Sequence, residues 1–143
     1  MSNDTLSREL RISREVDGSL NSILADMQKL MDDTRIHESG MEVHQMANLV
    51  AVAQETDSVE VVKHYIRYQL GRDSQNKTWR WRLGSGKNFG EQLVDRLDGL
   101  RDRAQLIVSE AKGDRPAEDR TWMTLTRLYI GHMRRYFVYR KKS

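Results

Sequence analysis

The segment SLNSILADMQKLMDDT, residues 19–34, decides the fold class of this 143-residue chain. Its apolar residues recur at intervals of three and four, the spacing that places side chains along one face of an α-helix. They are Leu20, Ile23, Leu24, Met27, Leu30 and Met31. Polar and charged residues fill most of the other positions. The segment therefore predicts an amphipathic helix that buries one stripe against the rest of the protein.

Four further segments predict helices in the same way. These segments cover residues 43–53, 57–70, 89–111 and 117–138. The helical spacing of apolar residues is weak in the first segment and clear in the other three. No segment shows a convincing period of two, the pattern of a β-strand. The sequence predicts an all-α fold, a single-domain bundle of about five helices over residues 1–143, in which residues 1–17 are either frayed or an extra N-terminal helix.

Capping and breaking residues mark where these helices begin and end. Asp57 and Glu60 have the spacing of a capping box, and Gly71 is a natural stop for the helix that they open. Asn88 can cap the next helix, and Pro116 can occupy the first turn of the last one.

The composition narrows the class of protein. The chain has no cysteine, which excludes disulfides, thiolate metal sites and thiol nucleophiles. Residues 1–18 lack the apolar core of a secretory signal, and the longest apolar run, Leu49–Ala53, is too short to span a bilayer. We therefore expect a soluble, cytoplasmic protein without a membrane partner.

Charge is distributed unevenly along the chain. Residues 1–50 hold five basic and nine acidic residues, whereas residues 51–143 hold 19 basic and 12 acidic ones. Two segments are especially basic: residues 63–87 contain seven basic residues and one acid, Asp73, and residues 120–143 contain seven and none. Two basic clusters in one half of a small protein suggest a polyanionic partner.

No pattern in the sequence predicts catalysis. The four histidines form no recognised metal-binding motif, and residues 84–87, GSGK, are too short for a P-loop. Asp95, Asp98 and Asp102 share a helix face but are surrounded by arginines, as on an ordinary solvated surface. We therefore expect no catalytic residue, no metal site and no cofactor, and we predict that the protein is not an enzyme.

The basic residues provide the candidate binding site. Lys63 and Arg67 can share a helix face, and Arg127 and Arg134 lie two turns apart with Gly131 between them. A glycine inside a helix permits close approach, here of a neighbouring helix, which we favour, or of a phosphate. The predicted nucleic-acid-binding residues are Lys63, Arg67, Arg72, Trp79, Arg80, Arg82, Lys87, Arg127, Arg134 and Arg135.

The loop predicted over residues 72–88 contains the motif Trp79-Arg80-Trp81-Arg82. Alternating indole and guanidinium groups suit a surface that stacks bases and pairs with phosphates. The alternative is that one or both indoles fold back and seal the core beneath the loop. The sequence leaves this choice open. The glycines before Lys87 can let backbone N–H groups approach a phosphate, or they form only a flexible turn, which we favour.

Two segments carry a resemblance to a known family. Residues 65–73, YIRYQLGRD, are followed by a loop, an amphipathic helix that starts at Phe89 and a last helix that ends in Tyr136-Phe-Val-Tyr139. This order resembles the small subunit of the Csm-type, type III CRISPR effector complex, over about residues 57–142. The matching positions are Tyr68, Gly71, Arg72 and Asp73, then Trp122, Tyr129, Tyr136 and Tyr139. The longer N-terminal third, the tryptophan-rich loop and the basic last helix depart from that pattern.

The resemblance implies a function in antiviral defence. Small subunits of this family are helical bundles that stack in more than one copy along a ribonucleoprotein filament. They contact the backbone of target RNA paired with guide RNA, and other subunits cleave the RNA. The implied partners are therefore guide RNA, target RNA and the other subunits of the complex.

Two other functions remain open from the residues alone. One is a helical protein–protein interaction module that docks an acidic partner through its basic half. In that case the acidic first half, around Asp32, Asp33, Glu38 and Glu42, can dock on the basic half of the next copy and give head-to-tail stacking. The other is a helical DNA-binding regulator, for which residues 113–116 are the only candidate turn of a helix-turn-helix motif.

Overall fold

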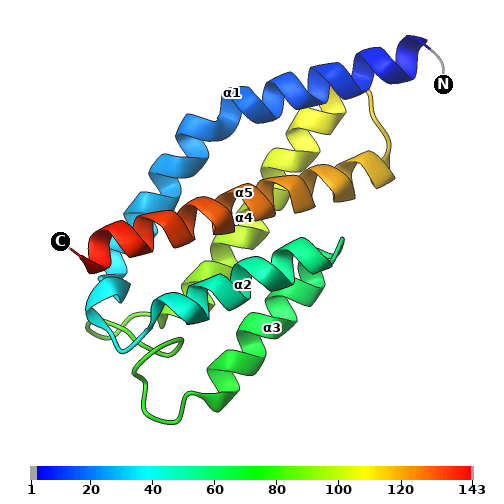
Figure 1. Ribbon diagram of the computed structural model, residues 1–143. Helices are drawn as coiled ribbons and strands as arrows, with labels where there is room; N and C mark the ends of the chain where they lie inside the picture. The colour runs from blue at the N-terminus through cyan, green and yellow to red at the C-terminus, as the bar shows by residue number, and fades with distance from the viewer. Residues whose placement is uncertain (1–2, 143) are drawn as a thin grey trace.

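The computed structural model describes residues 3–142, which form an all-α bundle and contain no β-strand (Figure 1). The helices are α1 (Asn3–Thr34), η1, a short 3₁₀ turn (Ile36–Glu38), α2 (Val43–Glu55), α3 (Val59–Arg72), α4 (Phe89–Glu110) and α5 (Arg115–Lys141). The predicted all-α class and all five predicted α-helices are confirmed. No helix in this part of the chain is both long enough and apolar enough to cross a bilayer.

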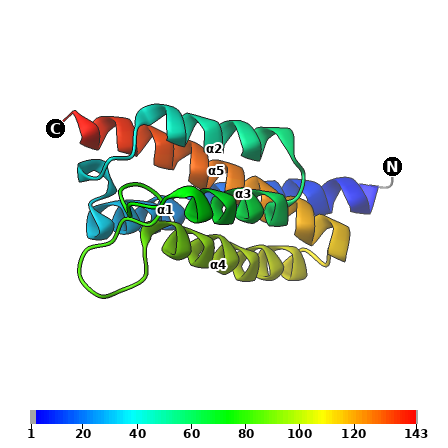
Figure 2. The same cartoon turned by 90° about the horizontal axis from the view of Figure 1, so that it is seen from below.

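Helix α5 is the centre of the bundle. It packs against α1, α2 and α4, while α3 packs on α2 and α4 at the edge (Figures 1 and 2). Its side chains Leu125, Tyr129, Met133 and Phe137 are fully buried, at helical spacing. Because several helices cover α5, its buried stripe is wide and includes Met123 and Ile130 as well as Trp122 and the other positions expected from spacing.

The first helix is longer than its clearest sequence signal. Helix α1 runs without a break from Asn3 to Thr34, so residues 3–17 are neither frayed nor a separate helix, and that part of the prediction is wrong. Met1 and Ser2 lie outside the described residues. The outer half of α1 is only lightly packed: Leu6 is 51 % exposed and Leu10 is 53 % exposed. A guanidinium nitrogen of Arg8 donates a hydrogen bond to the carbonyl of Lys112 at 3.4 Å. This bond holds the outer half of α1 near the end of α4.

The helix boundaries follow local signals with two exceptions. The predicted stop at Gly71 is wrong, because α3 continues to Arg72 and Asp73 is its C-cap. Asn88 caps α4 by accepting the backbone N–H of Glu91 at 2.9 Å, and Pro116 lies in the first turn of α5, as predicted. The predicted capping box at Asp57 is wrong, because Ser58 occupies the N-cap position of α3 without a side-chain bond. Asp57 instead accepts a hydrogen bond from Arg127, 70 positions further along the chain. A capping box does form at α2, between Glu42 and Gln45.

The loop between α3 and α4 is fastened to three other parts of the fold. The carbonyl of Lys77 accepts the N–H of Gly40 at 2.7 Å, in the linker before α2. The indole N–H of Trp81 donates to the carbonyl of Thr34 at 2.8 Å, at the end of α1. The backbone carbonyls of Trp79 and Trp81 accept the first backbone N–H groups of α4, from Gly90 and Phe89 respectively, each at 2.8 Å. This loop is therefore an ordered part of the fold.

Close contact between α3 and α4 explains one glycine. A Cβ atom at Gly90 would lie 2.7 Å from a methyl carbon of Leu70. Any larger side chain at Gly90 would force the side chain of Leu70 to move from its position at the end of α3. Gly131 has no such role, since a Cβ there would meet nothing within 4 Å. The prediction that Gly131 permits close helix packing is therefore wrong.

Candidate nucleic-acid interface

The two loop tryptophans belong to the core. Trp79 is 1 % exposed and packs against Phe89 with the ring centroids 6.1 Å apart. Trp81 is partly buried and is fixed by its bond to Thr34. The alternative in which the indoles seal the core is therefore the one that the structure adopts. Trp79 as a nucleic-acid-binding residue was a wrong prediction, because its ring has no exposed face on which a base can stack.

Lys63 is also unavailable to a phosphate. Its side chain lies in a buried position beside Trp122, and its Nζ contacts Asp98 at 2.7 Å and Glu60 at 3.2 Å. Burial alone would lower the pKa of Lys63, but the hydrogen bonds that it donates to these two carboxylates raise it overall. The lysine is a charged side chain that joins α3 to α4, and its assignment to the binding site was wrong.

Two more predicted residues are already paired with carboxylates. Lys87 contacts Asp95 at 2.8 Å. Arg127 donates to the carbonyls of Ala53 and Thr56 and pairs with Asp57, at 3.0, 2.7 and 3.0 Å. Arg127 thereby fastens the end of α2 to α5. Neither residue adds free positive charge to the surface.

Six predicted residues remain exposed or at the surface without a carboxylate within 4 Å among residues 3–142. They are Arg67, Arg72, Arg80, Arg82, Arg134 and Arg135. Arg72 stacks over the ring of Tyr68 at 5.5 Å, which leaves its guanidinium free to bind an anion. Lys77, which the sequence analysis did not select, has the same character; its position inside a run of seven basic residues was the available signal.

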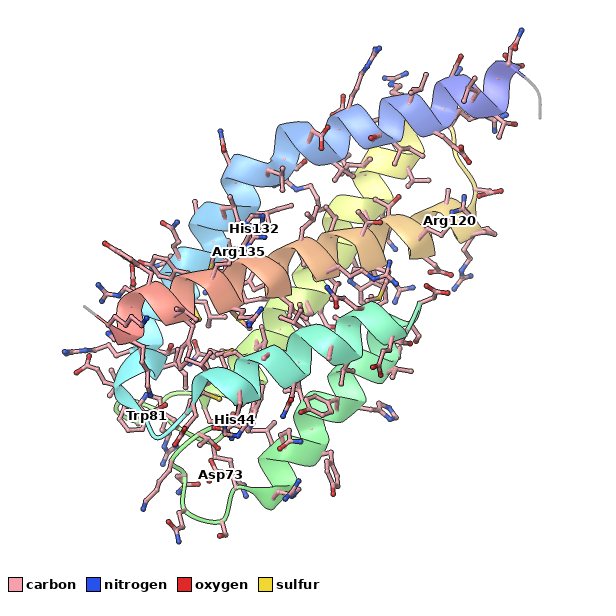
Figure 3. The ribbon with its side chains drawn as sticks, viewed as in Figure 1. His44, Asp73, Trp81, Arg120, His132 and Arg135 are labelled. Atoms are coloured by element: carbon pink, nitrogen blue, oxygen red, sulfur yellow. The ribbon has the colours of Figure 1, made fainter. Side chains whose placement is uncertain are left out.

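Arg72 and Lys77 lie beside the first turns of α2, where they line a hollow together with His44 and Asn48. Arg127 binds the C-terminal end of α2, and Lys141 donates to the carbonyl of Met41 just before its N-terminal end. Helix α2 therefore runs antiparallel to α5, and Arg134, on the same side of α5 as Arg127, lies beside it. Arg135 lies next to His132 on the exposed part of α5, towards the opposite end from Arg120 (Figure 3).

Helix α2 carries one carboxylate, the exposed Glu55 at its last position, and His44 is its only other ionisable side chain. Residues 43–54, VHQMANLVAVAQ, contain no aspartate, glutamate, lysine or arginine. The neighbouring stretches 61–72 and 120–142 contain no acid either. We call the exposed residues among 43–54, together with Arg134 and Arg135 of α5 and with Arg72 and Lys77 near the end of α3, the α2 face.

A polar hollow lies at one end of the α2 face. It is open to solvent, has a volume of about 380 Å³ and is lined by residues of α2, α3 and the start of the loop. His44 and Asp73 lie at this end of the bundle (Figure 3). Its lining includes Asn48 of α2, Tyr65, Gln69 and Arg72 of α3, and Asp73, Gln75, Lys77 and Trp79 of the loop.

Asp73, the one acid in the basic run, is used to fold the loop. Its carboxylate accepts backbone N–H groups from Arg80 at 2.9 Å, Thr78 at 3.0 Å, Lys77 at 3.3 Å and Gln75 at 3.4 Å. Burial alone would raise the pKa of Asp73, but these four donors lower it overall. The carboxylate is therefore ionised at neutral pH, and backbone dipoles balance its charge.

The acidic patch proposed for head-to-tail stacking is largely paired within the chain. Asp32 accepts the hydroxyl of Tyr136 at 2.8 Å and lies 3.4 Å from Arg140. Asp33 pairs with Lys29 at 2.8 Å, and Glu38 pairs with Arg35. These acids offer little free charge to a second copy.

Comparison with known proteins returns no match to this chain, neither to a protein family, nor to a curated protein, nor to a solved structure. Within residues 3–142 no three histidine or acidic side chains gather in a way that could hold a metal ion.

Proposed function

We propose that the protein binds the phosphate backbone of RNA across the α2 face, as a non-catalytic subunit of a ribonucleoprotein assembly. The observation that carries this proposal is the pairing state of the basic residues. Those on the α2 face have no carboxylate partner in the described chain, whereas Lys63, Lys87 and Arg127 do. Exposed arginines beside residues 43–54, a stretch without carboxylates, attract a polyanion. The acids that border this stretch, Glu42 and Glu55, lie at its two ends.

Arginine–phosphate contacts give affinity without sequence choice, because phosphates carry no base identity. The open surface at Gly131, between Arg127 and Arg134, lets a strand lie close to α5. The resemblance of residues 57–142 to the Csm-type small subunit supplies the more specific form of the proposal. In that form the RNA is target RNA paired with guide RNA, the partners are subunits of a type III CRISPR complex, and the location is the cytoplasm.

The salt dependence of RNA binding tests the proposal. Each phosphate neutralised on a single strand contributes about −0.7 to the slope of log K against log salt, so the four cations of the α2 face predict a slope of about −3. Fluorescence anisotropy of a labelled, unstructured RNA between low and moderate salt measures it. Replacing Arg134 and Arg135 by alanine removes two contacts and should reduce the slope to about −1.5.

A matched double variant controls for net charge. Arg11 and Arg14 are exposed on α1 and, among residues 3–142, have no carboxylate partner. R11A/R14A has the same net charge as R134A/R135A, and its slope should equal that of the wild type. A slope near zero for the wild type, or equal losses in the two double variants, contradicts the proposal.

A protein–protein function is the second candidate, and the small apolar residues of α2 favour it. Ala47, Val50 and Ala51 lie at least partly at the surface beside Arg134, a combination that suits an amphipathic acidic helix. Salt-independent binding to a protein partner, without measurable RNA binding at physiological salt, identifies this function. Stacking of copies is tested separately by sedimentation velocity with and without RNA.

A further inference from the structure

The hollow at the end of the α2 face has the chemistry of a nucleobase site. Its lining residues include Asn48, Gln69 and Gln75, whose side chains end in amides, and Tyr65, whose side chain ends in a hydroxyl. An amide offers a donor and an acceptor together, which is what the edge of a base requires, whereas a phosphate needs donors alone. The amides of Asn48 and Gln75 have no hydrogen-bond partner among residues 3–142.

The backbone of the loop argues against a phosphate in the same hollow. A turn with several converging N–H groups is the usual cradle for a phosphate. Here four such groups already bind the carboxylate of Asp73. Asp73 also lines the hollow and is ionised at neutral pH, since its pKa is lowered. An anion in the centre of the hollow would meet a fixed negative charge and no free backbone donors from this turn.

The floor and the rim of the hollow are also suited to a base. Trp79 lies beneath it and, being 1 % exposed, gives a fixed boundary. Tyr65 of α3 is partly buried against the core. Burial raises its pKa overall, although Arg72 and a hydrogen bond with Gln69 oppose that rise, so its hydroxyl stays protonated. A volume of about 380 Å³ is at the small end of the range for organic ligands. Arg72 and Lys77 also line the hollow and supply its positive charge.

We propose that this hollow holds one nucleobase of the bound strand, turned out from its neighbours. Its edge is read by Asn48 and Gln69, and the flanking phosphates contact Arg72 and Lys77. The inference rests on the proposed function and deepens it: the backbone supplies affinity at every position, and one position carries a base preference. Splayed bases read by side chains are the usual way in which proteins distinguish single-stranded RNA sequences.

Strands of equal charge test the inference. Affinities are measured by anisotropy for four RNA strands that differ in one central base and for a strand that is abasic at that position. The best base should bind about tenfold more tightly than the abasic strand, the ratio expected of one well-formed amide–base pair. The double variant N48A/Q69A should lose this preference and keep the wild-type affinity for the abasic strand.

A control variant and a second measurement make the test decisive. Gln54 is an exposed amide on α2 outside the hollow, and Q54A should keep the base preference. In NMR titrations of the wild type, nucleoside 5′-monophosphates should shift the side-chain amide signals of Asn48 and Gln69, whereas inorganic phosphate should not.

The outcomes separate the two proposals. Equal affinity for all five strands, with a steep salt dependence, overturns the base site and leaves backbone binding intact. Equal shifts with inorganic phosphate identify an anion site and also overturn the base site. Failure of every strand to bind overturns the proposed function, while shifts by monophosphates alone would preserve the hollow as a nucleotide site.

Discussion

Replacing Asp73 by alanine should disorder the α3–α4 loop. The expected loss in the free energy of unfolding can be calculated from the hydrogen bonds of Asp73. Two of its four hydrogen bonds have ordinary lengths, 2.9 and 3.0 Å, and two are long, 3.3 and 3.4 Å. Hydrogen bonds to a charged group contribute about 1.5–3 kcal/mol each. Counting the two short bonds at the low end, because the carboxylate is partly exposed, gives about 3 kcal/mol. For a chain of this size that lowers Tm by about 10 °C.

The assay combines urea denaturation with hydrogen exchange. The D73A variant should show a lower urea midpoint and faster exchange at the amides of Gln75, Lys77, Thr78 and Arg80. D73N tests the role of charge, since its amide keeps one acceptor but points an NH₂ group at backbone donors. Asp102 is an exposed acid on α4 with no partner among residues 3–142, and D102A should change stability by less than about 0.5 kcal/mol.

The same carboxylate predicts a pH dependence with a definite sign. The pKa of Asp73 lies below its ordinary value of 3.8 in the folded protein, so the unfolded chain binds more protons in that range. Its stabilisation is therefore fully present above pH 3.8 and is lost as the pH falls below that value. The stability difference between wild type and D73N should be constant from pH 5 to 7 and shrink in acid. Unchanged exchange at the four amides, or a difference that grows in acid, would refute the reasoning.

Two further substitutions test assignments that the structure changed. K63M keeps the packed aliphatic stem of the side chain and removes its charge. Because Asp98 is half-exposed, we expect a stability loss of only about 1 kcal/mol in urea denaturation and an unchanged salt slope for RNA binding. A reduced salt slope would show that Lys63 belongs to the binding surface. W79A empties a core position and should cost about 3–5 kcal/mol in urea denaturation. A cost below about 1 kcal/mol would show that Trp79 is not part of the core.

Helix positions could be predicted because their signals are local. The apolar spacing of residues 19–34 depends only on the pitch of a helix, and Asn88 and Pro116 act within one turn of their own position. The prediction for Asp57 was wrong because its carboxylate accepts a hydrogen bond from Arg127, which is distant in sequence. The start of α1 was misjudged because Leu6 and Leu10 are followed by few apolar residues, and Arg8 is held by the far end of α4.

The candidate site depended more on tertiary contacts. Nothing near Lys63 in the sequence indicates that Asp98, on another helix, neutralises it, and the same holds for Arg127. The WRWR motif suggested base stacking because alternation of aromatic and basic residues is common in such surfaces. In the fold, Trp79 and Trp81 turn inwards while Arg80 and Arg82 stay outside, since backbone bonds to α4 fix the direction of the chain. Only pairing and burial, which require coordinates, separated free cations from structural ones.

The three anchors of the α3–α4 loop have a consequence for the order of folding. They reach the end of α1, the linker before α2 and the start of α4, so the loop has few native partners until those helices have docked. We therefore expect it to order late, after the bundle has collapsed, because loop closure between distant segments is entropically costly until other contacts hold them. Two of the three tryptophans of the chain lie in this loop. In a refolding experiment, a slow change in intrinsic fluorescence after the helical circular dichroism signal has recovered would report the ordering of this loop. The hollow would form in the same step.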